Sequence, residues 1–377
     1  MINKERMLSE FINLCKISSF SRNERLVADY LVPALKVLGF AVVEDATGSA
    51  IGGNCGNLIA RKTGNLADAP TLMFSAHMDT VGPCEGVVPV IADDGYVYSS
   101  GDTVLGGDDK AGIVAIMEAS RYLVEKNVPH GDLEIIFSVC EEQGITGAKH
   151  VDLSKLKFDY GYVLDAGGTP AHIITCAPAQ DTFTVKIHGK AAHAGARPED
   201  GVNAILAAAN AISEMKLGRI DNETTANVGI IQGGTATNII ADLVEMKCEA
   251  RSRNTVKLDA QVKHMLDTFK LEAEKLGAIV ECDYHREYDS WQHDKNAAVM
   301  KLATAAAENA GLALSFREGG GGSDANIYNA AGRDTIVIGV GMSQVHATNE
   351  RILVSDIYKA AEYVVSIIKT AAGGLKC

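Results

Sequence analysis

The sequence lacks the patterns that mark secreted, membrane-embedded or nucleic-acid-binding proteins. Residues 1–11 mix charged and apolar side chains without an apolar core of signal-peptide length, and no later stretch is long and uninterrupted enough to span a bilayer. Basic residues are in the minority, since 35 Lys and Arg stand against 48 Asp and Glu and give a formal net charge of −13. This charge favours solubility and argues against nucleic acid or an anionic membrane surface as a partner.

Paired cysteines and nucleotide-binding motifs are also absent. None of the eight cysteines forms a Cys-x-x-Cys spacing, and Cys140 and Cys248 fall in apolar strand patterns, where small buried thiols are ordinary. The glycine run at 319–322 lacks the Lys-Ser/Thr of a phosphate-binding loop, and no dinucleotide fingerprint follows a first strand. We therefore expect a cytoplasmic protein that does not bind nucleotides.

The order of predicted elements indicates two domains, as the length of 377 residues also suggests. Strands and helices alternate up to about Pro178, which predicts an α/β domain with a largely parallel sheet covered on both faces. A βαββαβ order follows, with strands at 182–188, 227–232, 243–250 and 279–286 and helices at 202–215 and 258–276. Such a ferredoxin-like unit can be inserted into another domain, because its first and last strands can lie side by side. We expect residues 1–179 and 289–377 to form the first domain and residues 180–288 to form the inserted one.

A histidine and an aspartate follow the apolar run at 71–74, at the end of a predicted buried strand. Residues two apart in an extended segment share a face, so His77 could bind a metal ion while the carboxylate of Asp79 accepts the other ring N–H. A structural histidine at a strand end fits this motif equally well.

Three further segments carry carboxylates. Asp108 and Asp109 lie among glycines before a strongly helical stretch, so Asp108 could bridge two cations while Asp109 caps the helix, and the cap alone is the simpler interpretation. Glu141 and Glu142 end a buried strand, where one could bind a metal ion and the other take a proton from water, although such pairs are also common on solvated surfaces. Asp165 stands where a short strand runs into glycines.

The last donor, His346, lies in a polar loop after the predicted strand at 335–340, where a lone histidine is more often solvated. All these donors are predicted to leave the carboxyl ends of buried strands, the edge at which open α/β sheets bind ligands. Oxygen and imidazole donors without thiolates suit Zn²⁺, with Mn²⁺ or Co²⁺ as substitutes. Two such ions about 3.5–4 Å apart would polarise a carbonyl and generate hydroxide, so the sequence predicts a two-metal hydrolase.

These motifs resemble those of the M20 metallopeptidases over nearly the whole chain. The sequence Gly-Asp-Asp-Lys-Ala-Gly at 107–112 resembles the peptidase T-like, or tripeptide aminopeptidase, branch. The resemblance implies a zinc-peptidase-like catalytic domain whose inserted domain serves as a lid and dimerisation domain. It also implies a homodimer, two zinc ions per subunit and a short peptide as substrate.

The same resemblance implies a role for each donor. His77, Asp108 and Asp165 would hold one zinc ion, and Asp108, Glu142 and His346 would hold the other. Glu141 would act as the general base and Asp79 would orient His77. The peptide bond between Asp108 and Asp109 would be cis, and the glycine segment at 319–322 would line the substrate cleft.

Residues of the inserted domain would bind substrate. By the resemblance, His193 reaches the neighbouring subunit's cleft and stabilises the oxyanion, whereas Asn238 and Arg251 bind substrate, Arg251 at a carboxylate. Arginine suits this task because its guanidinium recognises a carboxylate with two hydrogen bonds. Arg253, two residues away on the same face, could take the place of Arg251.

The choice of substrate rests on weaker features than the choice of reaction. The segment at 346–352 is similar to the carboxypeptidase and aminoacyl-hydrolase members rather than to peptidase T. A carboxypeptidase or an N-acyl-amino-acid amidohydrolase is therefore the alternative to an aminopeptidase or tripeptidase. A non-catalytic dimeric binding protein of the same fold is a more distant alternative, because it would require the loss of a ligand or of the base.

Overall fold

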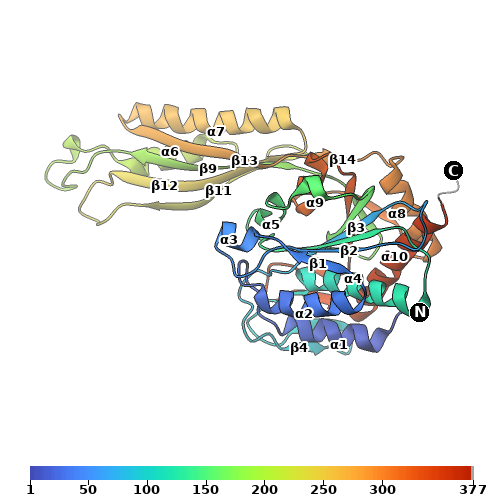
Figure 1. The fold of residues 1–377 in the computed structure, drawn as a ribbon. Coiled ribbons are helices and arrows are strands. Elements are labelled where there is room, and N and C mark those ends of the chain that lie inside the picture. Colours follow the sequence, from blue (N-terminus) through green and yellow to red (C-terminus); the bar gives the residue numbers. More distant parts are fainter. Residues whose placement is uncertain (375–377) are drawn as a thin grey trace. The chain divides into compact units, whose positions relative to one another are not determined.

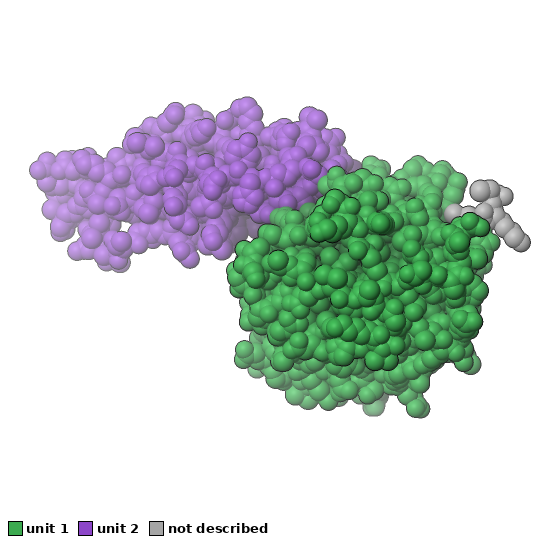
Figure 2. Space-filling model, in the orientation of Figure 1, with its two compact units in different colours: residues 1–176, 292–319, 323–377 green, residues 177–291, 320–322 purple. Residues whose placement is uncertain are grey.

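The computed structural model describes residues 1–374, which form two compact units (Figure 2). Unit 1 comprises Met1–Cys176, Gln292–Gly319 and the chain from Ser323 onward. Unit 2 comprises Ala177–Trp291 and Gly320–Gly322. Among residues 1–374, no helix is both long enough and apolar enough to cross a membrane.

Unit 1 is built on a nine-stranded sheet (Figure 1). Its strands are β1 (Ala41–Glu44), β2 (Leu58–Lys62), β3 (Leu72–His77), β6 (Leu133–Ser138), β7 (Tyr160–Ala166), β8 (His172–Ala177), β14 (Trp291–Gln292), β15 (Ser315–Glu318) and β16 (Thr335–Gly339). They follow the order β1-β2-β6-β3-β7-β16-β8-β14, and β15 pairs with β8. The central strands β6, β3, β7 and β16 are parallel, which confirms the predicted α/β class.

Helices cover both faces of this sheet, because its central strands are apolar on both sides. Phe74 of β3 stacks on Tyr162 of β7, whose hydroxyl donates to the carbonyl of Val299 in α8. On the opposite face of β3, Ser75 lies against Tyr328 of α9. The helices of unit 1 are α1 (Lys4–Cys15), α2 (Arg25–Val37), α3 (Thr47–Ile51), α4 (Gly107–Lys126), α5 (Thr146–Lys149), α8 (Ala298–Asn309), α9 (Asp324–Ala330) and α10 (Val354–Ala372).

A second, four-stranded sheet in unit 1 was not predicted. Its order is β17-β18-β5-β4, and all three pairs of neighbours are antiparallel. The strands are β4 (Pro89–Ile91), β5 (Tyr96–Ser99), β17 (Met342–Ser343) and β18 (Arg351–Leu353). Segments this short carry no readable alternation, and the pairing of β5 with β18 joins distant parts of the sequence.

Unit 2 has the predicted ferredoxin-like topology. The elements are β9 (Ala179–His188), α6 (Ala204–Glu214), β10 (Gly218–Arg219), β11 (Thr224–Gly233), β12 (Leu243–Ser252), α7 (Thr255–Lys275) and β13 (Ile279–Tyr288). The sheet order is β10-β11-β12-β9-β13, so the first and last long strands, β9 and β13, pair directly. A buried core of alanines from α6 and larger apolar residues such as Phe183 and Phe269 joins the helices to the sheet.

Candidate metal centre

Asp108 faces two imidazoles, one with each carboxylate oxygen. Its Oδ1 lies 3.1 Å from Nε2 of His77, and its Oδ2 lies 3.4 Å from Nε2 of His346. His77 is the last residue of β3, and His346 follows β17 in a left-handed conformation with φ 62°. Two further carboxylates complete these contacts: Oδ1 of Asp165 lies 3.7 Å from Nε2 of His77, and Oε2 of Glu142 lies 2.9 Å from Nε2 of His346.

The start of α4 is held close to the central sheet. A side chain at Gly112 would meet the carbonyl oxygen of Leu164 in β7 at 2.6 Å, so only glycine lets the helix approach this strand. Asp109 lies at a kink inside α4 and accepts hydrogen bonds from the Gly112 and His77 amides at 3.1 and 3.2 Å. The first is the contact expected of a helix cap, although α4 as a whole begins after Gly106. The Asp108–Asp109 peptide bond is cis, as the resemblance implied.

The position of Asp108 corrects one expectation. His77 and Asp165 lie at or near the carboxyl ends of β3 and β7, and Glu141 and Glu142 follow β6 after a short turn. Asp108, however, comes from the beginning of α4 and not from a strand of the central sheet. The prediction that every donor leaves a buried strand is therefore wrong for Asp108, because the preceding strand, β5, ends at Ser99 and belongs to the four-stranded sheet.

Glu350 supports Asp108 and was missed from the sequence. Its Oε2 accepts a hydrogen bond from the Gly106 amide at 2.8 Å, and its Oε1 accepts one from the Asp108 amide at 2.9 Å. Glu350 is buried, although a lone acidic residue in a polar segment is expected to be exposed to solvent. No local feature of the sequence distinguishes it from a surface carboxylate.

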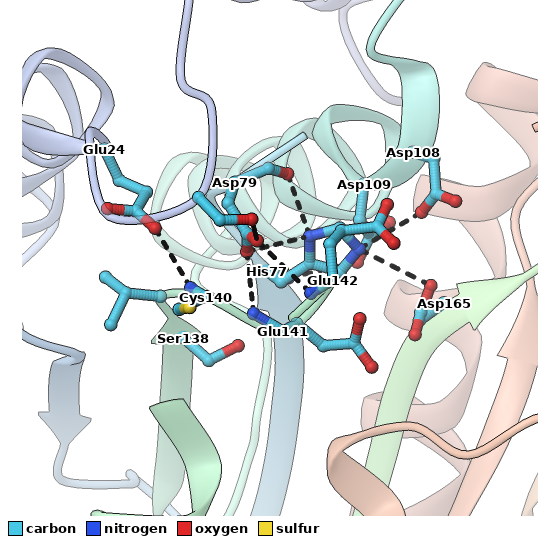
Figure 3. A network of polar contacts seen from close by, with 12 residues as sticks. Glu24, His77, Asp79, Asp108, Asp109, Ser138, Cys140, Glu141, Glu142 and Asp165 are labelled. Atoms are coloured by element: carbon cyan, nitrogen blue, oxygen red, sulfur yellow. Dashed lines mark hydrogen bonds and ion pairs between the residues drawn. The ribbon is translucent and has the colours of Figure 1, made fainter. Parts of the chain in front are cut away.

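Asp79 has a different set of contacts from the one expected. Nδ1 of His77 lies 2.9 Å from the backbone carbonyl oxygen of Asp79 but 3.4 Å from its carboxylate. The carboxylate mainly accepts hydrogen bonds from the Glu141 and Glu142 amides, at 3.0 and 3.2 Å, and from the Ser21 hydroxyl at 2.6 Å. Figure 3 shows these contacts of Asp79 with the imidazole and with the backbone of Glu141.

Burial and neighbouring charges shift the pKa values of the histidines and carboxylates in this cluster. Burial opposes protonation of His77, but contacts with Asp108 and Asp165 outweigh it and raise its pKa well above the usual value. Asp108 and Glu142 raise the pKa of His346 to about 10. Burial raises the pKa of Asp165 to about 7. Burial alone would also raise the pKa of Asp108, but His346 and His77 hold it below its usual value.

The donor atoms fit divalent cations. Two ligands of a tetrahedral zinc ion with bonds of about 2.0–2.2 Å lie about 3.3–3.6 Å apart. The four imidazole-to-carboxylate distances described above range from 2.9 to 3.7 Å. In addition, Oε1 of Glu142 is buried without a hydrogen-bond partner among the described residues, which suits an atom whose partner is a cation.

The donors form one continuous cluster. Three groups have their ligand atoms within 4.8 Å of one another: His77 with Glu141 and Asp165, His77 with Asp108 and Glu142, and Asp108 with Asp109 and Asp165. These candidate groups differ from the two ligand sets that the resemblance implied, since they include Glu141 and Asp109 and leave out His346. Glu141 is buried, and burial together with the charge of Asp165 raises its pKa well above the usual value.

His193 and Asn238 lie in unit 2 and are brought together there. Their loops pair, because the Ala194 amide donates to the Asn238 carbonyl at 2.9 Å and His193 forms a bridge with Ile239. The Gly195 and Ala196 amides both donate to Nδ1 of His193. Nδ1 is therefore an acceptor, and Nε2 carries the proton of the neutral ring.

Arg251 lies at the other end of β12 from these loops. The strand has 10 residues, and about 3.4 Å per residue makes its length about 34 Å. The guanidinium of Arg251 donates to Glu249 through Nε at 3.1 Å and through Nη2 at 2.9 Å. Nη2 of Arg253 donates to the carbonyl of Asn222 at 3.2 Å.

The glycine segment packs against β13. A side chain at Gly322 would meet the ring of Tyr288 at 2.3 Å, so glycine is required there. Asp324, just after this segment, is buried and accepts a hydrogen bond from the Ser138 hydroxyl at 2.5 Å. Burial raises the pKa of Asp324 to about 6.

Residues 73–370 match the model of peptidase family M20/M25/M40. The chain belongs to this family. The expectations of an M20 peptidase and of its fold class are confirmed.

Three solved structures are similar to this M20 peptidase. A tripeptidase of Staphylococcus aureus is 40% identical with a TM-score of 0.95, and the match covers 99% of this chain and 100% of the tripeptidase chain. The aminopeptidase PepT of Bacillus cereus is 42% identical with a TM-score of 0.90, over 98% and 99% of the two chains. A dinuclear metal-binding M20 peptidase of Bacillus subtilis shares the fold, at 18% identity and a TM-score of 0.74, over 97% of each chain.

Proposed function

We propose that this M20 peptidase is an aminopeptidase that cleaves short peptides, tripeptides foremost, at a centre of two zinc ions. The observation that carries the proposal is that the two oxygens of Asp108 face two different imidazoles, those of His77 and His346. A carboxylate in this position can bridge two cations. The two similar structures at 40% and 42% identity, a tripeptidase and an aminopeptidase, support the choice of substrate.

In this proposal His77, Asp108 and Asp165 hold one ion, and Asp108, Glu142 and His346 hold the other. Two bound cations would polarise the scissile carbonyl and activate the attacking water. Glu141 takes the proton of that water and passes it to the leaving amine. The buried position of Glu141, close to His77 and Asp165, suits this role.

We also propose that the protein forms a homodimer through unit 2, and the positions of the proposed substrate residues support this. His193 and Arg251 belong to opposite ends of one sheet of unit 2, whose strand β12 has 10 residues. One unit 2 therefore does not bring both side chains to the same small substrate. We propose that Arg251 serves its own chain's site, and that His193, with its proton on Nε2, serves the partner's site as an oxyanion donor. Asn238, in the loop paired with that of His193, would bind substrate beside it.

A cytoplasmic location is part of the proposal. None of the seven cysteines among the described residues is in a disulfide, and six of them are buried. Cysteines that do not form disulfides suit a reducing compartment. Fractionation of the cells that make this protein tests the location, and recovery outside the cytoplasm would contradict it.

Peptide length and blocked termini test the proposed activity. We expect the zinc-loaded protein to cleave trialanine faster than dialanine or tetraalanine, and to release the N-terminal residue. N-acetylated trialanine is the matched control, because it differs only in the free amine that an aminopeptidase requires. Faster hydrolysis of an N-acetyl amino acid would favour the amidohydrolase, and release of the C-terminal residue from the acetylated peptide would favour the carboxypeptidase. No turnover of any substrate by protein with two bound ions would favour the non-catalytic binding protein.

A further inference from the structure

Three side chains outside the proposed ligands hold the peptide that carries Glu141 and Glu142. Asn57 accepts a hydrogen bond from the Val139 amide at 3.0 Å through Oδ1. Glu24 accepts one from the Cys140 amide at 3.0 Å through Oε1. The carboxylate of Asp79 accepts hydrogen bonds from the next two amides, those of Glu141 and Glu142. Side chains therefore accept hydrogen bonds from four consecutive backbone N–H groups. We call residues 139–142 the base turn.

The base turn has a conformation that its own sequence does not favour. β6 ends at Ser138, and Cys140 adopts a left-handed conformation with φ 53°. This conformation is unfavourable for a residue with a side chain. The chain beyond it is fixed by the Thr146 amide, which donates to the Cys140 carbonyl at 3.0 Å. An external partner for the Cys140 amide therefore helps to decide where the next residue, Glu141, points.

Glu24 is that partner, and its side chain does not cap the helix that follows it, α2. Instead Oε1 accepts from the Arg22 amide at 2.7 Å and from the Cys140 amide, and Figure 3 shows the carboxylate directed to Cys140. The side chain is fully buried, and Oε2 has no hydrogen-bond partner among the described residues. A buried carboxylate with an unsatisfied oxygen is costly, so stability alone does not explain it.

We propose that Glu24 is a positioning residue for the reaction: by accepting the Cys140 amide it holds the base turn, and thereby aims the Glu141 carboxylate. This inference rests on the proposed function, in which Glu141 carries the proton. Glu24 itself belongs to none of the candidate metal groups. Misplacement of a reacting group by about 1 Å can cost a factor of about 100 in rate, so loss of this contact should be visible in kcat.

Two variants test the proposal. Glu24→Ala removes the acceptor, and we expect kcat at saturating zinc to fall about 10- to 100-fold while KM stays within about twofold. Glu24→Gln keeps a carbonyl oxygen for the same two amides, so its kcat should stay within about twofold of wild type. Hydrogen exchange supplies a readout independent of activity: amides of the base turn should exchange faster in Glu24→Ala and at the wild-type rate in Glu24→Gln.

Glu10→Ala is the matched control for the loss of a buried carboxylate. Glu10 in α1 is buried and accepts hydrogen bonds from Tyr30 and Arg121, away from the base turn. We expect Glu10→Ala to lower the melting temperature without changing kcat. Wild-type kcat in Glu24→Ala, or an equal loss in Glu24→Gln, would overturn the positioning role. Full activity in Glu141→Gln would instead overturn the proposed function, so the two failures are distinguishable.

Discussion

His346 and Asp108 lie with Nε2 and Oδ2 3.4 Å apart, although more than half of the chain separates them in sequence. The other oxygen of Asp108 contacts His77, so this one carboxylate joins the two halves of the donor cluster. Glu350, four residues after His346, also fixes the backbone of Asp108. Asp108 is therefore the residue on which the proposed two-metal centre depends most.

Removal of Asp108 should affect both ions, and removal of His346 only one. We expect Asp108→Ala to retain less than one zinc ion per chain and His346→Ala about one, against about two in the wild type. Elemental analysis after exhaustive dialysis measures this content. Equal metal content in the two variants would contradict the bridging role of Asp108.

Replacement of Glu141 with glutamine should separate catalysis from metal binding. If this residue carries the proton, Glu141→Gln should lower kcat about 10²–10⁴-fold with little change in metal content. Glu134→Gln is a suitable control, because Glu134 is buried on the strand before the turn but pairs with Arg61. Retention of wild-type activity by Glu141→Gln would show that another group moves the proton.

Loss of Glu350 should weaken metal binding without removing a ligand. Its carboxylate holds the Gly106 and Asp108 amides, and supporting partners of this kind contribute about 10- to 100-fold to metal affinity. We expect Glu350→Ala to raise the dissociation constant for zinc by this factor, as measured by competition with a chelator. An unchanged dissociation constant would leave Glu350 a purely structural residue.

The metal-free protein should lose stability as pH rises. The folded-state pKa of His346 is raised to about 10 from 6.5, and that of Asp165 to about 7 from 3.8. Between each pair of values the folded chain binds more protons than the unfolded chain, so its stability falls as pH rises. The contribution of His346 is complete below pH 6.5 and disappears as pH passes about 10.

Metal should reverse this trend, because cations replace the protons. We expect the melting temperature of the metal-free protein to fall between about pH 6 and pH 9, and zinc affinity to rise over the same range. Calorimetry in buffers of different ionisation enthalpy should detect protons released on zinc binding. A rise in the melting temperature of the metal-free protein over this range would contradict the charge balance described for the cluster.

Mixed dimers should reveal whether His193 acts across subunits. Chains carrying His193→Ala and chains carrying Glu141→Gln should each be inactive as homodimers. When they are co-expressed in equal amounts, about a quarter of all sites should combine an intact Glu141 with an intact His193 from the partner. Co-expression of Glu141→Gln with Asp108→Ala is the control, because no mixed site is then intact. Absence of recovery in purified mixed dimers would place His193 in its own chain's site.

Local patterns predicted most of the framework. The apolar runs of β3, β6 and β7 determine strands that are buried on both faces, and the polar residue after each run has to appear at a sheet edge. The βαββαβ order of unit 2 follows from alternating periodicities in the same way. The short strands β4, β5, β17 and β18 were missed because long-range pairing, and not local propensity, creates them.

The sequence by itself determined the candidate metal ligands, since donor type and the motif around each donor are local properties. Only the tertiary structure decided how they meet: Asp108 arrives from a helix start, and Glu350 and Glu24 act through backbone amides of distant segments. A hydrogen bond from a backbone amide to a remote buried carboxylate leaves no mark on the sequence around either partner. Packing alone brings such pairs together, because burial makes each unpaired polar group costly and the fold has to satisfy it.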